Sequence, residues 1–286
     1  MNVIDASRID SAYENGAFSL DRWKEYIRKA FPPAEALCLD DLEECLKAGL
    51  SWENDYLPML NQAYQNAAAR ARALASFRSL TVDLNDRVRS VFGREIDADL
   101  VLYLGLGSGA GWVTQLGGRT AVLFGIEKIV ELGWEGEKSM TGLIYHELGH
   151  VYHRQHGVLD REFAENADRF LWQLFTEGVA MVFEQMLAGG EEYFHQYDEE
   201  WTEWCGANLR RIANDFNSDL GPMTFENQRY FGDWVEYDGR GDTGYYLGAR
   251  FVQRIMKTHP FDELIDFDID EVKARFKAFL NDLNEE

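Results

Sequence analysis

Residues 141–157 read TGLIYHELGHVYHRQHG, and positions 146–150 of this stretch form the motif HExxH. Residues four apart on an α-helix lie one above the other on the same face. The side chains of His146 and His150 can therefore bind one metal ion together when the stretch is helical. The spacing predicts a metal-binding helix over about residues 138–156, which Gly157 ends as a C-terminal cap.

The residues around the motif indicate an active-site helix. Glu147 follows the first histidine, and from there its carboxylate can act as general base toward a water molecule on the metal without being a ligand. Apolar side chains at helical spacing can face a core on the other side of the helix, namely Leu143, Ile144, Leu148 and Val151. The plainer alternative is a packing helix whose two histidines have ordinary structural contacts.

The third ligand has two candidates, because a catalytic zinc ion normally has three protein ligands and one open position for water. FTEGVA at 175–180 places Glu177 on a second long helix, which can return antiparallel to the first and meet the two histidines. The alternative is His156, since HELGHVYHRQH approaches a pattern in which a glycine breaks the helix three residues after the second histidine. His153 occupies that position here, so we predict continued helix and Glu177 as the ligand.

Four residues and their spacing resemble the zinc site of gluzincin-type peptidases, namely His146, Glu147, His150 and Glu177. VLYLGLG and TAVLFGIEKI before the motif, TEGVA after it and a late GYYLGARFVQ are similar to a family of predicted zinc-dependent bacterial proteases whose natural substrates are mostly unknown. The resemblance covers about residues 97–257. It implies a zincin-like fold, Zn2+ as the cofactor and a peptide or protein as the substrate, with Glu147 as general base and the zinc-bound water as nucleophile.

One position departs from that resemblance. Some gluzincins carry an aspartate four residues after the ligand glutamate, where it supports a zinc-bound histidine, but this chain has Met181 there. Glu184 and Asp168 are the candidates for the supporting role. His195 and His259 stand alone in the sequence, so we expect ordinary structural roles for both.

Two tyrosines are candidates for stabilising the negative charge that develops on the substrate carbonyl during hydrolysis. DTGYYLG at 242–248 predicts a helix start with Asp242 or Thr243 as the N-cap, which places Tyr245 and Tyr246 near a helix N-terminus. The resemblance favours Tyr245. The alternative is that both rings pack beneath a loop.

Three short segments indicate strands, namely residues 97–104, GWVTQL at 111–116 and TAVLFGI at 120–126. In gluzincin-like architecture an edge strand beside the metal helix pairs with an extended substrate, and the segment with Trp112 and Thr114 is the candidate. The glycine-rich GLGSGAG at 105–111 follows a strand, as phosphate-binding loops do, but neither a helix start nor a lysine comes after it. We therefore predict a flexible hairpin connection there.

The remaining segments are mostly of helical character, which predicts an α+β protein that is mainly helical, with a small mixed or antiparallel sheet. We expect a helical N-terminal subdomain or cap over residues 1–95 and a zincin-like catalytic region over residues 96–286. Residues 96–157 of that region hold the sheet and the HExxH helix, and residues 158–286 form a helical C-terminal lobe. Interleaved Gly, Pro, Asp and aromatic residues predict a long, partly ordered loop over the site at 217–243.

Composition restricts the partners and the location. A formal net charge of −22 over 286 residues disfavours a nucleic-acid partner, because phosphate contacts need clustered Lys and Arg. No run approaches ~18 apolar residues and no export leader is evident, so we expect neither a membrane span nor secretion. Three cysteines without a CxxC pair suit a reducing cytoplasm. The sequence does not reveal the oligomeric state.

Two rival functions fit the same motif. A non-catalytic binding protein with a zincin fold would hold a structural metal or none, and it would need neither an open coordination position nor Glu147. A zinc hydrolase of a non-peptide amide or ester would use the same metal chemistry with a differently shaped pocket. The main prediction is a zinc metallopeptidase.

Overall fold

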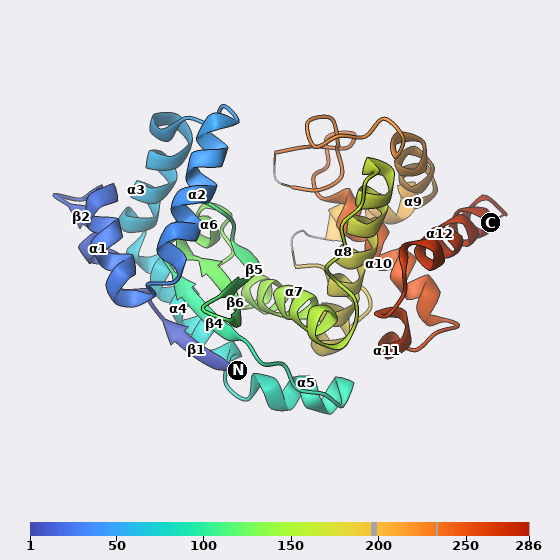
Figure 1. Cartoon of the computed structure of the whole chain (residues 1–286), viewed down its shortest axis with the longest axis horizontal. Coiled ribbons are helices and arrows are strands. Elements are labelled where there is room, and N and C mark those ends of the chain that lie inside the picture. The colour runs from blue at the N-terminus through green and yellow to red at the C-terminus, as the bar shows by residue number, and fades with distance from the viewer. Residues whose placement is uncertain (196–198, 233, 286) are drawn as a thin grey trace. The chain divides into compact units, whose positions relative to one another are not determined.

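The computed structural model describes the whole chain except residues 196–198, 233 and 286. It contains two compact units, Met1–Glu147 and Leu148–Glu286, and the division falls inside helix α7 (Glu137–His156) (Figure 1). Helices take up about 61% of the chain beside a small sheet, so the prediction of a mainly helical α+β protein is confirmed. The predicted boundary after residue 95 stays a prediction.

The first unit is built on a four-stranded mixed sheet with the strand order β1-β4-β6-β5. Strands β1, β4 and β6 are parallel, and β5 runs antiparallel to β6 at the edge of the sheet. The four strands span Asn2–Asp5 (β1), Asp99–Tyr103 (β4), Gly111–Leu116 (β5) and Arg119–Gly125 (β6). The three predicted strands are therefore confirmed, while β1 was not predicted.

The two central strands explain why the sheet forms here. Residues 100–102 of β4 and 122–124 of β6 are fully buried apolar side chains, as parallel strands covered on both faces require. The prediction of a hairpin at residues 105–111 is wrong, because β4 and β5 are not neighbours in the sheet. The hairpin joins β5 to β6 through Gly117 and Gly118, whose φ angles of 58° and 78° suit the tight turn.

The rest of the first unit is helical. Its helices are α1 (Leu20–Ala30), α2 (Ala34–Lys47), α3 (Leu57–Gln65), α4 (Ala67–Leu80), α5 (Leu84–Phe92) and α6 (Ile126–Glu131), with short turns η1 (Ile9–Ala12) and η2 (Trp52–Tyr56) and a small ribbon of β2 (Tyr13–Glu14) and β3 (Ala17–Phe18). Helices α3 and α4 both pack on α6. The indole of Trp23 donates a hydrogen bond of 2.9 Å to the carbonyl of Leu104, so α1 is fastened to the end of β4.

The second unit is helical. After the last residues of α7 it contains α8 (Asn166–Ala188), α9 (Glu199–Asp219), α10 (Thr243–Met256), α11 (Phe261–Leu264) and α12 (Ile269–Glu285). Helices α8 and α10 cross at Gly178 and Gly248, where a Cβ added to Gly248 would lie 2.6 Å from the carbonyl oxygen of Leu174 and 3.0 Å from the amide nitrogen of Gly178. The two glycines thus let the helix backbones touch. In the part of the chain that the structure describes, no helix is both long enough and apolar enough to span a membrane.

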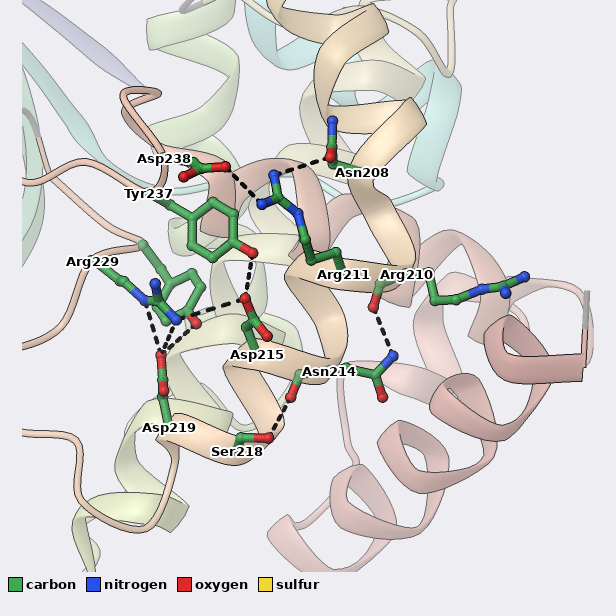
Figure 2. Close-up of polar contacts among 11 residues, drawn as sticks. Asn208, Arg210, Arg211, Asn214, Asp215, Ser218, Asp219, Arg229, Tyr237 and Asp238 are labelled. Atoms are coloured by element: carbon green, nitrogen blue, oxygen red, sulfur yellow. Dashed lines mark hydrogen bonds and ion pairs between the residues drawn. The ribbon is translucent and has the colours of Figure 1, made fainter.

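The segment after α9 is fastened to that helix by polar side chains, as Figure 2 shows. Arg229 forms an ion pair of 3.0 Å with Asp219, and its guanidinium lies 4.7 Å from the centre of the Tyr237 ring. The Tyr237 hydroxyl donates a 2.6 Å hydrogen bond to Asp215. The predicted loop at 217–243 begins later than expected, since α9 continues to Asp219, and Arg229 and Tyr237 tie it to α9.

Candidate metal centre

The structure brings together the three predicted metal ligands. His146, His150 and Glu177 each offer one ligand atom, and these atoms all lie within 4.8 Å of one another. His150 Nε2 and Glu177 Oε2 are 3.3 Å apart. His146 is buried at 6% exposure, whereas the other two are partly exposed, so the group has a protected side and an accessible side.

The glycine inside the motif explains how Glu177 reaches the histidine helix. A Cβ added to Gly149 would lie 2.7 Å from the Cα atom of Ala180, which is closer than side chains approach. With hydrogen in place of a side chain, α7 and α8 can touch at this point. Because Glu177 lies three residues before Ala180 and His150 directly follows Gly149, the contact sets the two ligands side by side.

The donor set fits a catalytic metal. Two imidazoles and one carboxylate are a common three-residue set for catalytic zinc, and imidazole nitrogen also suits other divalent first-row metals. Three protein ligands leave a coordination position for water or substrate. The residues therefore fit the expected cofactor, while their chemistry alone does not select zinc among these metals.

Glu147 lies at 7% exposure on the same helix, next to His146. Its side chain lies directly over the first residue of β5, because a Cβ added to Gly111 would be 2.8 Å from Glu147 Cγ and 2.9 Å from Oε1. The contact between these two residues was not predicted from the sequence. A glycine at the start of an edge strand was the available signal, since it marks a close approach of another group to the backbone.

The alternative ligand His156 is not in the metal-binding group. Helix α7 remains regular through His156, and the imidazole packs on the ring of Tyr152 with 4.6 Å between the centres. His153, which stands where a helix-breaking glycine would be needed, is fully buried with its Nε2 3.0 Å from the carbonyl oxygen of Ile265. Burial, with the neighbouring His150, lowers the pKa of His153 to about 3.

The two tyrosines proposed for the oxyanion have different surroundings, although both lie in the first turn of α10. Tyr246 is 3% exposed and stacks on Phe194 at 5.1 Å, and its hydroxyl lies 3.1 Å from where a Cβ of Gly206 would stand. Tyr245 is partly exposed and makes an edge contact of 5.6 Å with Phe231. It lies one turn before Gly248, at the crossing of α10 with the helix that carries Glu177.

The candidates for supporting a histidine ligand have other partners. Glu184 lies 2.9 Å from Nδ1 of His195, and both side chains are buried. Asp168 forms an ion pair of 2.7 Å with Lys273. His259 lies 2.8 Å from Glu263 one turn further on. These contacts give His195 and His259 structural partners outside the metal-binding group.

One buried acid escaped the sequence analysis. Glu127 is fully buried in the first turn of α6, and its carboxylate accepts hydrogen bonds from the backbone amides of Gly105 and Gly107 at 2.9 and 3.1 Å. The signal that pointed to it was the glycine-rich stretch itself, which was predicted to be only a connection.

Comparisons of the chain with protein-family models, with curated proteins and with solved structures find no match.

Proposed function

We propose that this protein is a zinc-dependent metallopeptidase of zincin-like fold that hydrolyses peptide bonds. The observation that carries the proposal is the convergence of His146, His150 and Glu177, whose ligand atoms all lie within 4.8 Å of one another. A buried carboxylate, Glu147, directly follows the first of these ligands. A structural metal site would need no such acid beside it.

Each residue of the site has a role in this reaction. His146, His150 and Glu177 would hold the zinc ion, which when bound supplies a Lewis acid that polarises the substrate carbonyl and lowers the pKa of water at the site. Glu147 accepts the proton of the attacking water and passes it to the leaving amine. A tyrosine hydroxyl then stabilises the negative charge on the former carbonyl oxygen.

Tyr245 is the better candidate for that hydroxyl. Tyr246 belongs to a hydrophobic cluster with Phe194 and Trp201, and the guanidinium of Arg250 lies 4.7 Å from the centre of its ring. Removing Tyr246 would therefore disturb packing whatever its chemical role. Tyr245 only borders that cluster, and its partial exposure leaves it accessible.

The substrate that fits this proposal is an extended peptide or protein segment. Strand β5 is the edge of the sheet, and its residues, Trp112 and Thr114 among them, are mostly half-buried. An edge strand offers unpaired amide and carbonyl groups to which a peptide main chain can add as a further strand. Because β5 begins beside Glu147, a peptide bound there would pass close to the general base. Three free cysteines accord with a cytoplasmic location.

Metal analysis tests the ligand set. Purified wild type, Glu177→Ala and His156→Ala proteins are dialysed identically, and their zinc content is measured by elemental analysis. We expect about one zinc per chain in wild type and in the His156 variant, and a loss in the Glu177 variant. Metal loss from the His156 variant alone would favour the alternative ligand set.

Turnover tests the reaction class. A panel of fluorogenic peptides is incubated with wild type and Glu147→Gln protein, each with and without a chelator. We expect metal-dependent cleavage by wild type and zinc-loaded but inactive Glu147→Gln protein. Cleavage that survives the Glu147 substitution would remove the assignment of the base. If the protein binds zinc but cleaves no peptide, ester and non-peptide amide substrates are tested next. Cleavage of these would assign the protein to the zinc hydrolases of non-peptide substrates.

A further inference from the structure

The glycine-rich loop at 105–111 is wrapped around the carboxylate of Glu127. The two carboxylate oxygens accept one hydrogen bond each, Oε2 from the amide of Gly105 at 2.9 Å and Oε1 from the amide of Gly107 at 3.1 Å. A Cβ added to Gly105 would lie 2.5 Å from Oε1, and one added to Gly125 would lie 3.0 Å from the same atom. Side chains at these positions would displace the carboxylate.

The loop therefore binds an acidic group, and that group belongs to the protein itself. Successive backbone amides of glycine-rich loops commonly bind phosphate, because no side chain keeps the anion away from the main chain. Here an internal carboxylate occupies that position. Each oxygen of the Glu127 carboxyl group accepts one backbone amide of the loop, so Glu127 fastens the loop to α6 at two points.

The loop also connects Glu127 with the proposed general base. Near the end of the loop the carbonyl of Ala110 accepts a 3.1 Å hydrogen bond from the amide of Gly125, and Gly111 then begins β5. The Glu147 side chain lies against this first strand residue, with its Cδ atom 3.0 Å from the position of an added Cβ. A shift of the loop would change the surface on which the Glu147 carboxylate rests.

We infer that Glu127 is a positioning residue, whose carboxylate holds the loop at 105–111 and thereby sets the start of β5 against Glu147. The functional part of this inference rests on the proposed peptidase activity. The structural part does not, since it concerns only the contact between Glu127 and the loop.

Glu127 is the group expected to change charge near neutral pH in this part of the structure, because the groups that face it stay uncharged there. Burial raises the pKa of Glu127 to about 7, although hydrogen bonds from backbone amides oppose the shift. Burial also raises the pKa values of the groups that face it, namely Tyr13 of β2, Tyr26 of α1, Cys38 of α2 and Tyr103 of β4. These four groups are uncharged near neutral pH. The adjacent Lys128 forms an ion pair of 2.6 Å with Glu131.

The first experiment follows the glycine amides by NMR on protein labelled with 15N-glycine. In wild type we expect the resonances of Gly105 and Gly107 to shift together with a midpoint near pH 7, because both amides donate to the same carboxylate. Glu127→Gln should move both resonances and abolish the titration. Glu131→Gln, a change of the same kind on the exposed side of α6, should leave the titration intact.

The second experiment compares kinetics and metal content. Glutamine keeps one acceptor oxygen but turns an amino group toward the second glycine amide, so the loop should shift. We expect a fall of about tenfold in kcat for Glu127→Gln at unchanged zinc content, since small displacements of catalytic groups have large effects on rate. Glu127→Asp has a side chain that is one methylene shorter, so its kcat should fall in the same way at unchanged zinc content. This variant is used instead if Glu127→Gln does not fold.

The outcomes separate this inference from the proposed function. Unmoved glycine resonances in the Glu127 variants overturn the structural part, and an unchanged kcat in a variant whose resonances have moved overturns the functional part. If neither variant folds, the wild-type titration decides the structural part, and glycine resonances that do not titrate overturn it. A wild-type protein without peptidase activity defeats the proposed function and with it the functional part, while the NMR measurement still tests the loop.

Discussion

Glycines of the two units make room for different neighbours. In the first unit, side chains are absent at Gly105 and Gly111 where the carboxylates of Glu127 and Glu147 lie. In the second unit, Gly178 and Gly248 adjoin the backbone of a crossing helix. The Glu147 side chain can move when a Cβ is added at position 111, whereas two packed helix backbones cannot. Under the proposed function, the glycine at position 111 leaves room for the general base, whereas Gly178 and Gly248 leave room for the contact of two helices.

Each unit buries a titratable group whose pKa shows the effect of burial. The first unit buries Glu127, whose carboxylate is held by backbone amides, and the second buries His153, which packs as a neutral imidazole. Burial disfavours the charged form of both groups. It therefore raises the pKa of the acid and lowers that of the base. The contributions of Glu127 and His153 to stability should therefore change with pH in opposite directions.

The largest expected effect is on the helix crossing of the second unit. Replacing Gly178 by alanine places a Cβ against the carbonyl group of Gly248, and we expect the free energy of unfolding to fall by about 3 kcal/mol. Gly190→Ala is the control, because its Cβ would enter open space. Urea denaturation of both variants measures the difference. Equal stability of the two would show that the crossing tolerates a side chain and would break the comparison.

The next largest effect is a loss of unfolding free energy at low pH, which is caused by His153. Its pKa is lowered from 6.5 to about 3, so the stability it contributes is present above pH 6.5 and is lost as the pH falls toward 3. By pH 4 the loss should reach about 3 kcal/mol relative to pH 7. Among the described residues Nδ1 has no hydrogen-bond partner that could accept the added proton. Unfolding free energies of wild type and His153→Gln at both pH values test this, and parallel losses would contradict it.

Glu127 should act in the opposite direction in the first unit. Its pKa is raised from 4.5 to about 7, so its contribution to stability is full below pH 4.5 and is lost as the pH rises through 7. Between pH 5 and pH 8 we expect a decline of about 2 kcal/mol that Glu127→Gln lacks. Denaturation at the two pH values, with Glu131→Gln as the control, measures it. The same decline in all three proteins would assign it to other groups.

The smallest effect on stability should accompany a clear effect on rate. Gly111→Ala brings a methyl group against the Glu147 side chain, which can move aside, so the unfolding free energy should change by less than about 1 kcal/mol. Under the proposed function kcat should fall by about tenfold, because the general base is displaced. Gly136→Ala, in open space, serves as the control for both measurements. A large loss of stability with an unchanged kcat would show that Gly111, like Gly178, is needed for packing and not for the placement of Glu147.

Local patterns predicted much of what the structure contains. Amphipathic and apolar runs indicated the helix with HExxH, the helical segments and three of the strands, because their periodicity is written in neighbouring residues. The same periodicity favoured Glu177 over His156, since no glycine interrupts the helix at His153. Strand β1 was missed because its pairing with β4 joins residues almost one hundred positions apart, and its own four residues are too few to show a period.

What the sequence by itself determined is the identity and helical spacing of the chemical groups at residues 146–150, because spacing along one helix is a local property. Only the tertiary structure decided which distant groups meet them. Glu177 lies beside His150 because α7 and α8 touch at Gly149 and Ala180, and Gly111, at the end of the loop around Glu127, lies beside Glu147. The loop at 105–111 was misinterpreted as a hairpin for the same reason. Contacts between distant residues depend on how the elements pack, and local patterns in the sequence do not reveal that packing.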